Sequence, residues 1–251
     1  MATDDPEYPI LVDTDALIAV ANSPLWELIS EHIGLTTTNV CQQELKRHRD
    51  ENRANAPEGS RPYRLHLGSA RVLEAIEDDE TPLTRAVSVP RPHGADAGEQ
   101  SLKQELVQHP ETVDYVVLMD AHGRRSIRRE IQDRDLSARV VPPTFLFYIL
   151  YDNDLISREE FCEACAELLE SEGWTGYQAV KATWEGIPVD CSDVGRLPAV
   201  SAEVTDTATR RATSRRASPA PRRRVASSIG RTSSPSGAVV RRRSPRGGVR
   251  G

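Results

Sequence analysis

Acidic side chains follow two apolar segments of this sequence, at the points where we expect strands to end. Asp13 directly follows the segment Tyr8–Val12, and Asp120 directly follows Asp114–Met119, which reads DYVVLM. If both segments are strands of a parallel sheet, their carboxyl ends meet at one edge, where proteins of this class bind ligands. Neighbouring carboxylates repel each other unless a cation joins them, and oxygen-only ligands favour a hard ion such as Mg²⁺ or Mn²⁺. The two aspartates therefore predict a metal site.

Two predicted helices bring further acids to the same region. Glu44 lies within the helix that we expect over Val40–His48. Asp96 and Glu99 begin the helix expected over Gly94–His109, and their spacing allows both to lie on one face of its first turn. An acid in a first turn also interacts favourably with the helix dipole, so these two positions have a purely structural explanation as well.

Strands and helices alternate along residues 8–200. Apolar segments predict strands at Tyr8–Val12, Leu35–Thr38, Arg85–Val89, Asp114–Met119 and Ala138–Val141. Helical spacing and capping signals predict helices at Asp13–Ala21, Val40–His48, Leu67–Ile76, Gly94–His109, 121–132, Thr144–Tyr151 and Ser157–Glu172, the last opened by a Ser-x-x-Glu capping box. Residues 50–62 are rich in helix breakers and predict a loop. The alternation favours an α/β fold in which helices cover a parallel sheet.

The charge of the chain is divided between an acidic body and a basic tail. From Thr205 to the end there are 13 Arg and one acid, which leaves residues 1–204 with 37 acidic and 19 basic side chains. Only three of the 32 basic residues are Lys. An acidic, Lys-poor body suits a protein that must stay hydrated in concentrated salt, so we expect a halophilic source. A GC-rich genome, which favours Arg codons, is a compatible explanation.

The segment 199–251 has no aromatic residues and no usable apolar period. Such a segment cannot offset the entropy of ordering a chain, so we predict a domain at 8–198 and a disordered Arg/Ser/Pro-rich tail at 199–251. Three interpretations of the tail remain open. It contacts nucleic acid electrostatically, it is a solvated tail without a partner, or it is the product of reading a GC-rich gene out of frame.

The lengths of the apolar runs and the number of cysteines indicate the cellular compartment in which we expect the protein. The longest apolar runs, such as Tyr115–Met119, are far shorter than the about 20 residues that span a bilayer. Met1–Glu7 is acidic and no apolar region follows it, so we expect no membrane insertion and a cytoplasmic location. The four Cys are too few for a disulfide scaffold, and Cys162-x-x-Cys165 has no second CxxC. We therefore expect reduced thiols rather than a zinc or redox site.

The order and spacing of the acidic motifs resemble those of the PIN domain, over about residues 9–175. The matching features are Val12-Asp13-Thr14 at a strand end, Glu44 in an xxEL pattern, Ala97-Gly98-Glu99 at a helix start, and Asp120 after Val-Val-Leu-Met. The resemblance implies a three-layer, Rossmann-like fold with helices on both faces of a parallel sheet. Thr144–Trp174 is similar to the C-terminal part of the VapC-like subgroup.

PIN domains are metal-dependent ribonucleases, so the resemblance implies hydrolysis of RNA phosphodiester bonds. Carried over by position, the catalytic and metal-binding acids are Asp13, Glu44, Glu99 and Asp120. Asp96 would substitute for Glu99 or assist it as a metal ligand, and Thr14 would orient a ligand or water. One or two Mg²⁺ or Mn²⁺ ions would lower the pKa of a bound water and neutralise phosphate charge, so no side-chain nucleophile is needed.

Arginines on the helix after the last acid are candidates for contact with RNA. Arg124 and Arg128 form one stripe of this helix, and Arg125 and Arg129 form the adjacent one. A site for a polyanion needs positive charge beside its acidic centre, and we expect Arg124 and Arg128 to bind substrate. The alternative is a solvated helix face paired with acids of the same helix. His122 flanks the site, and we expect it to be polar surface.

The VapC-like resemblance implies a toxin of a toxin–antitoxin pair, with an antitoxin protein as partner and a homodimer as a common assembly. The segment 50–93 is longer than compact PIN toxins usually carry between their second and third acids. Two other functions remain open. One is a catalytically inactive PIN-like module that binds a partner. The other is a haloacid-dehalogenase-type phosphatase that uses Asp13 of Asp13-Thr14-Asp15 as nucleophile.

Overall fold

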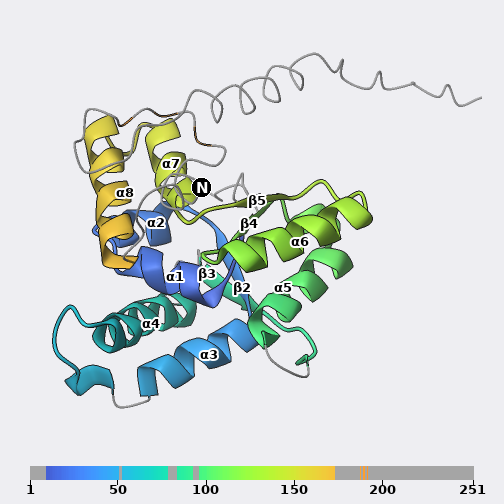
Figure 1. Cartoon of the computed structure of the whole chain (residues 1–251), viewed down its shortest axis with the longest axis horizontal. Helices are drawn as coiled ribbons and strands as arrows, with labels where there is room; N and C mark the ends of the chain where they lie inside the picture. The colour runs from blue at the N-terminus through green and yellow to red at the C-terminus, as the bar shows by residue number, and fades with distance from the viewer. Residues whose placement is uncertain are drawn as a thin grey trace, which may run out of the picture. The chain divides into compact units, whose positions relative to one another are not determined.

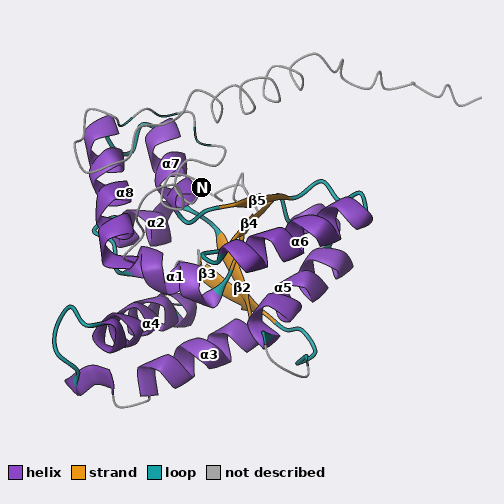
Figure 2. Cartoon of the chain, in the orientation of Figure 1, coloured by secondary structure: helices purple, strands orange, loops and turns teal. Residues whose placement is uncertain are grey.

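The computed structural model describes residues 10–50, 53–78, 84–92 and 96–172, together with Ile187, Val189 and Cys191. Within these residues, short strands alternate with helices (Figures 1 and 2). The strands are β1 (Ile10–Val12), β2 (Leu35–Thr38), β3 (Thr84–Val87), β4 (Tyr115–Val117) and β5 (Arg139–Val141). Every pairing is parallel, and the strand order is β3-β2-β1-β4-β5. The predicted parallel α/β fold is confirmed.

Eight α-helices connect the strands in the described part of the chain. They are α1 (Thr14–Ala21), α2 (Trp26–His32), α3 (Asn39–Asp50), α4 (Arg61–Glu77), α5 (Ala97–Gln108), α6 (Ala121–Asp133), α7 (Thr144–Asp152) and α8 (Arg158–Glu172), with 3₁₀ turns η1 (Arg53–Asn55) and η2 (Pro110–Thr112). Helices α5 and α6 lie on one side of the sheet, and α1, α7 and α8 lie on the other (Figure 1). The three-layer arrangement is therefore confirmed too.

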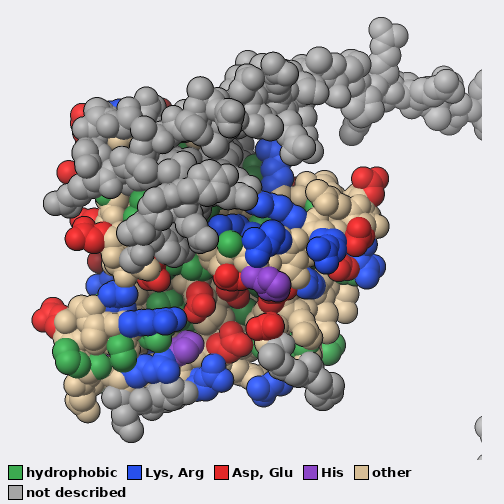
Figure 3. Space-filling model, viewed as in Figure 1, with side chains coloured by type: hydrophobic (Ala, Val, Ile, Leu, Met, Phe, Trp, Pro, Cys, Tyr) green, Lys and Arg blue, Asp and Glu red, His purple; other side chains and the backbone are tan. Residues whose placement is uncertain are grey.

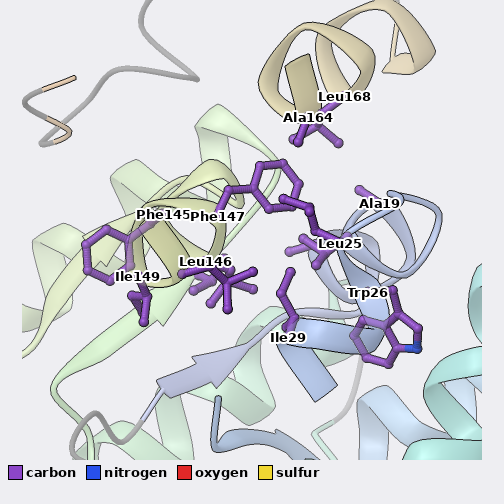
Figure 4. Packing of buried hydrophobic residues seen from close by; sticks show 14 of the residues in the cluster. Ala19, Leu25, Trp26, Ile29, Phe145, Leu146, Phe147, Ile149, Ala164 and Leu168 are labelled. Carbon is purple, nitrogen blue, oxygen red and sulfur yellow. The ribbon is translucent and has the colours of Figure 1, made fainter. Parts of the chain in front are cut away.

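Side chains along the strands alternate between two apolar cores. Ile10 and Val12 belong to the larger core, which α1, α2, α7 and α8 complete, and Leu11 belongs to the smaller core under α5 and α6. In the larger core, α2 packs against α7, and α7 against α8 (Figure 4). Burial of each fully buried Val, Leu, Ile or Phe side chain contributes about 1.5–3 kcal/mol to the stability of the fold. Burial on both faces explains why the strands read as nearly continuous apolar runs.

Capping signals account for two helix starts. The predicted capping box opens α8: the Glu160 N–H donates to Ser157 Oγ (3.2 Å), and the Ser157 N–H donates to Glu160 Oε2 (2.7 Å). The loop predicted at 50–62 is wrong at its end, because α4 begins at Arg61. Ser60 caps this helix, and Pro62 lies in its first turn, where a missing N–H costs nothing. The helix α2 was not predicted from the sequence.

α4 packs against α1 and α3, and a glycine allows the closest approach. A Cβ atom added to Gly68 would lie 2.7 Å from both Ile18 O and Asn22 Nδ2. The Arg71 guanidinium also donates to Ala21 O (2.8 Å) at the end of α1. α4, which lies between the second and third candidate acids in the sequence, thus supports α1, the helix that follows Asp13.

The expectation of four reduced thiols is wrong for two of them. Cys162 in α8 forms a disulfide with Cys191, at a sequence separation of 29, whereas Cys41 and Cys165 are buried free thiols. The bond joins α8 to a segment in which Ile187 and Val189 are also buried. Cysteine spacing alone does not reveal which pairs meet in space.

Some sequence predictions concern residues outside the described ones. These are the first two residues of the first strand, residues 51 and 52 of the predicted loop, the first two residues of the helix expected over Gly94–His109, the end of the Thr144–Trp174 resemblance, the domain boundary at 198 and the tail at 199–251. Among the described helices, none is both long and apolar enough to cross a bilayer.

Candidate active site

β1 and β4 are neighbours in the middle of the sheet, and each leads directly into an acid. Val12 pairs with Val117, and the Asp13 N–H donates to Val117 O (3.0 Å). Asp13 is the N-cap residue of α1, and Asp120 is that of α6. From β1 the chain continues to β2 on one side, and from β4 it continues to β5 on the other. The acids thus lie at the switch point of the sheet, where parallel α/β proteins form a crevice.

Glu44 reaches this edge from α3 and contacts two other elements. Thr14 Oγ1, at the start of α1, donates to Glu44 Oε2 (2.8 Å). A Cβ atom added to Gly98 in the first turn of α5 would lie 2.9 Å from the same oxygen. The backbone of α5 therefore lies directly against the Glu44 carboxylate, and three helices meet at this point.

Gly123, in the first turn of α6, is where the remaining two acids meet. A Cβ atom added there would lie 3.4 Å from Glu99 Oε2 and 3.6 Å from Asp120 Oδ2. Because both oxygens lie within 4 Å of one point, the Glu99 and Asp120 carboxylates are neighbours. A Cβ atom there would be in ordinary van der Waals contact with both oxygens, and its tightest contact, 3.2 Å, would be with Leu118 Cδ2.

Hydrogen bonds from the protein fix one oxygen of each of these two carboxylates. Lys103 Nζ lies 2.8 Å from Glu99 Oε1 and also donates to Ser126 Oγ (2.6 Å) on α6. The Gly123 N–H donates to Asp120 Oδ2 (2.6 Å). Lys103 thereby joins the helix that carries Glu99 to the helix that Asp120 begins. The Glu99 oxygen that faces Gly123 is the other one, Oε2.

Asp13 lacks a side-chain capping bond and is surrounded by like charge. Burial is the largest of the causes that raise the pKa of Asp13 from 3.8 to about 7. The charge of Asp15 raises it next, and the charges of Glu44 and Glu99 add to this. A hydrogen bond from the Thr14 backbone opposes these effects only in part. Ionising Asp13 among other acids is therefore costly, and a bound cation would offset that cost. The surroundings of Asp13 thus favour cation binding.

The pKa of Glu99 moves in the other direction. Burial is the largest single effect and opposes its ionisation, whereas hydrogen bonds from Lys103 and Ser126 favour it. The positive charges of Lys103 and His122 contribute as well, so the pKa of Glu99 is lowered. Glu99 is therefore an anion at neutral pH. The space-filling view shows Asp and Glu side chains gathered in the middle of this face, with His, Lys and Arg side chains around them (Figure 3).

The family of the chain follows from a comparison with known protein families. The family model described as "Halobacterial PIN domain" matches residues 1–197. The chain belongs to this family. PIN domains are generally nucleases and generally use divalent metals, and the halobacterial description supports the halophilic source expected from the charge balance. No curated protein and no solved structure matches the chain.

The acids of this PIN domain fit a hard divalent ion by their chemistry. All are oxygen donors, as Mg²⁺ and Mn²⁺ require, and the negative charges of Asp15, Glu44 and Glu99 all act on Asp13. Among the described residues, however, no three His, Cys, Asp or Glu side chains already stand at the spacing of a metal site. The Thr14 hydroxyl, the Lys103 ammonium and the Gly123 N–H occupy oxygens of three of the acids. The acidic side chains lie near one another, but their oxygens do not all point to one position that a metal ion could occupy.

Asp96 differs from the other candidate acids of the PIN domain. It is exposed at the N-cap of α5, makes no side-chain capping bond, and has a left-handed backbone (φ 61°). Asp tolerates this conformation better than most residues. The structure gives no contact that brings Asp96 to the other acids, and its predicted role as a metal ligand stays a prediction.

The two predicted substrate-binding arginines lie on the inner side of α6. Arg124 is only 4% exposed, and its Nη1 donates to Leu118 O (3.0 Å) and Met119 O (2.7 Å), in the loop that carries Asp120. Arg128 is half-buried, and its Nη2 donates to Val140 O (3.3 Å). These contacts position the loop before Asp120 and the end of the sheet. Binding of substrate by these two residues stays a prediction.

Sequence reasoning overlooked three residues that shape the site. Gly98 leaves room for the Glu44 carboxylate, the Gly123 N–H holds Asp120, and Lys103 holds Glu99. The Glu99–Lys103 spacing of four residues was a readable signal for an ion pair on a helix. Gly98 was part of the Ala97-Gly98-Glu99 motif, but its need for a missing side chain arises only from the contact with Glu44 across the chain.

Proposed function

We propose that this PIN domain is a metal-dependent endoribonuclease that hydrolyses phosphodiester bonds in RNA. The observation that carries the proposal is the gathering of acids around Asp13, whose pKa is raised to about 7 by burial and by neighbouring negative charge. Isolated surface acids do not behave in this way, and a buried cluster of like charges persists only when its cost is offset by a function. A divalent cation offsets it directly.

Four side chains would hold Mg²⁺ or Mn²⁺ in this proposal, namely Asp13, Glu44, Glu99 and Asp120. When bound, such ions activate a water molecule and neutralise charge on the scissile phosphate. The protein's own share is orientation: the Thr14 hydroxyl holds Glu44, and the Lys103 ammonium holds Glu99. The Gly123 N–H holds Asp120 in the same way. Carboxylates that are oriented in advance need little rearrangement when a charged ligand arrives.

A PIN-like module that binds RNA without cleaving it is the alternative. The test is Mn²⁺-dependent cleavage of a labelled single-stranded RNA in concentrated KCl. We expect cleavage by the wild type and loss of at least about 100-fold in rate for Asp120→Asn, which removes a charge and keeps the shape. Asp133→Asn, at the exposed end of α6, is the matched control and should cleave as the wild type does. Equal background activity in wild type and Asp120→Asn contradicts the nuclease.

Membership of the PIN family argues against the haloacid-dehalogenase interpretation, which rested on Asp13-Thr14-Asp15 alone. We extend the proposal to a toxin role, an antitoxin partner, a homodimer and a cytoplasmic location on the VapC-like resemblance. The test of the toxin role is growth arrest on expression of the wild type but not of Asp120→Asn. Rescue by a small protein encoded beside it would identify the antitoxin.

A further inference from the structure

We infer that His122, Arg125 and Arg129, here called the α6 stripe, bind the phosphate backbone of the RNA strand as it leaves the acidic centre. The inference rests on the proposed nuclease function and adds the direction in which the substrate runs. The arginines that it assigns to RNA, Arg125 and Arg129, each follow by one residue those that the sequence favoured, Arg124 and Arg128.

The apolar contacts of α6 decide which arginines face outward. Ile127 is fully buried, and Ile131 packs against the same core. Arg124 and Arg128 share the i, i+3, i+4, i+7 face of these two residues, which is why they donate to backbone carbonyls. The α6 stripe lies on the other face, and its three side chains are exposed.

The α6 stripe begins at the acidic centre and leads away from it. Asp120 is the N-cap of the helix, and His122 is exposed in its first turn. At 1.5 Å per residue, Arg125 lies about 7.5 Å and Arg129 about 13.5 Å along the helix from Asp120. In Figure 3, His and basic side chains border the acids on the side of α6. When one phosphate of an RNA strand lies at the acids, the next phosphates of that RNA therefore lie beside the positive charges of the α6 stripe.

The charge of the α6 stripe is not neutralised within the helix. Glu130, which follows Arg129, forms an ion pair with Arg134 at the end of α6. Within the described residues, the side chains of Arg125 and Arg129 form no hydrogen bond and no ion pair. Exposed cations beside a strongly acidic centre would weaken cation binding there, so their presence needs a polyanionic ligand to explain it.

Guanidinium groups suit this task in concentrated salt. The Debye length falls to about 3 Å at 1 M salt, so attraction at a distance is lost and contact remains. Arg donates two parallel hydrogen bonds to a phosphate, whereas Lys acts as a point charge. A surface that must hold phosphates by contact is therefore built from Arg.

The test measures binding separately from cleavage. A fluorescent single-stranded RNA is titrated with the full chain in the Asp120→Asn background, so that the RNA stays intact, over a series of KCl concentrations. The variant Arg125→Gln/Arg129→Gln is compared with Arg85→Gln/Arg139→Gln, which removes the same charge from exposed positions on the two edge strands. We expect the stripe variant to raise Kd about tenfold and to reduce the slope of log K against log [KCl] by about 1.4, at 0.7 per phosphate contact.

The outcomes separate this inference from the proposed function. A larger loss in the stripe variant than in the control supports the α6 stripe, and in the active protein the same variant should raise KM with little change in kcat. Equal affinity of the stripe variant and its parent, or an equal loss in both variants, overturns the inference even if the wild type cleaves RNA. If binding depends on the α6 stripe but the wild type does not cleave, the inference holds and the nuclease proposal fails.

Discussion

Replacing Asp13 by Asn should make the metal-free protein more stable at neutral pH. The pKa of Asp13 is raised to about 7 in the folded protein, against 3.8 for an unperturbed side chain. The folded state thus holds this proton more tightly than the unfolded state does. The stability that Asp13 contributes is fully present below pH about 4, falls as pH rises, and is lost once pH passes about 7. Asn has the same shape and no charge, so this loss should be absent in the variant.

The size of the effect follows from the two pKa values. At 1.36 kcal/mol per pKa unit, a rise from 3.8 to about 7 corresponds to about 4 kcal/mol. Part of the Asp13 side chain remains accessible to solvent, which screens its interactions with other charges, so we expect about 2–4 kcal/mol. Burial is the largest cause of the shift, and added salt does not screen burial. The effect should therefore persist in concentrated KCl.

Urea unfolding between pH 3.5 and 8.5, in a chelator and constant KCl, measures this difference. We expect wild type and Asp13→Asn to be similar at the lowest pH, and the variant to be more stable by about 2–4 kcal/mol at the highest. Asp133→Asn, at an exposed site, should show no such divergence. Added Mn²⁺ should then stabilise the wild type more than Asp13→Asn. A difference between the two proteins that does not change with pH would refute the buried, acid-crowded environment of Asp13.

Three further predictions concern the support of the site. Gly98→Ala places a methyl group 2.9 Å from Glu44 Oε2, so single-turnover cleavage should slow about 10- to 100-fold; an unchanged rate would mean that Glu44 moves without consequence. Arg124→Met leaves two backbone carbonyls without their donor and should cost about 2–5 kcal/mol in urea unfolding, whereas a solvated arginine would cost less than 0.5 kcal/mol. Breaking the Cys162–Cys191 bond, by Cys191→Ser or by a dithiol reductant, should cost about 3 kcal/mol for a loop of this length. Equal stability of the oxidised and reduced protein would show that the bond does not constrain the unfolded chain.

The strands and the acids that follow them were predictable because their signals are local. A parallel strand buried on both faces needs a continuous apolar run, and DYVVLM provides one around β4. The residue after such a strand lies at the carboxyl edge of the sheet wherever the strand sits. Asp13 and Asp120 could therefore be selected without knowing the strand order.

The orientation of α6 was also readable but was overlooked. Arg124, Ile127, Arg128 and Ile131 share one helical face, and isoleucines face a core when a helix packs on a sheet. The arginines beside them had to turn inward and find partners, because a buried charge is costly without hydrogen bonds. Arg124 and Arg128 were selected by their charge alone, without regard to the apolar face of the helix that they share.

The start of α4 and the disulfide were not accessible in the same way. Ser60 and Pro62 are turn residues in many sequences, and only the helix that follows makes them a cap and a first turn. Cys191 is buried together with Ile187 and Val189, and the burial of residues so distant from Cys162 leaves no trace in cysteine spacing.

The sequence by itself determined the parallel α/β class, the family and the order of acids along the chain, since each depends on short segments whose meaning is local. Tertiary structure alone decided which oxygen of Glu99 is held by Lys103, which acids crowd Asp13, and which glycine makes room for Glu44. Those features are differences of a few tenths of an ångström or a few kcal/mol between groups that lie far apart in the chain. Packing sets such differences once the helices are seated on the sheet.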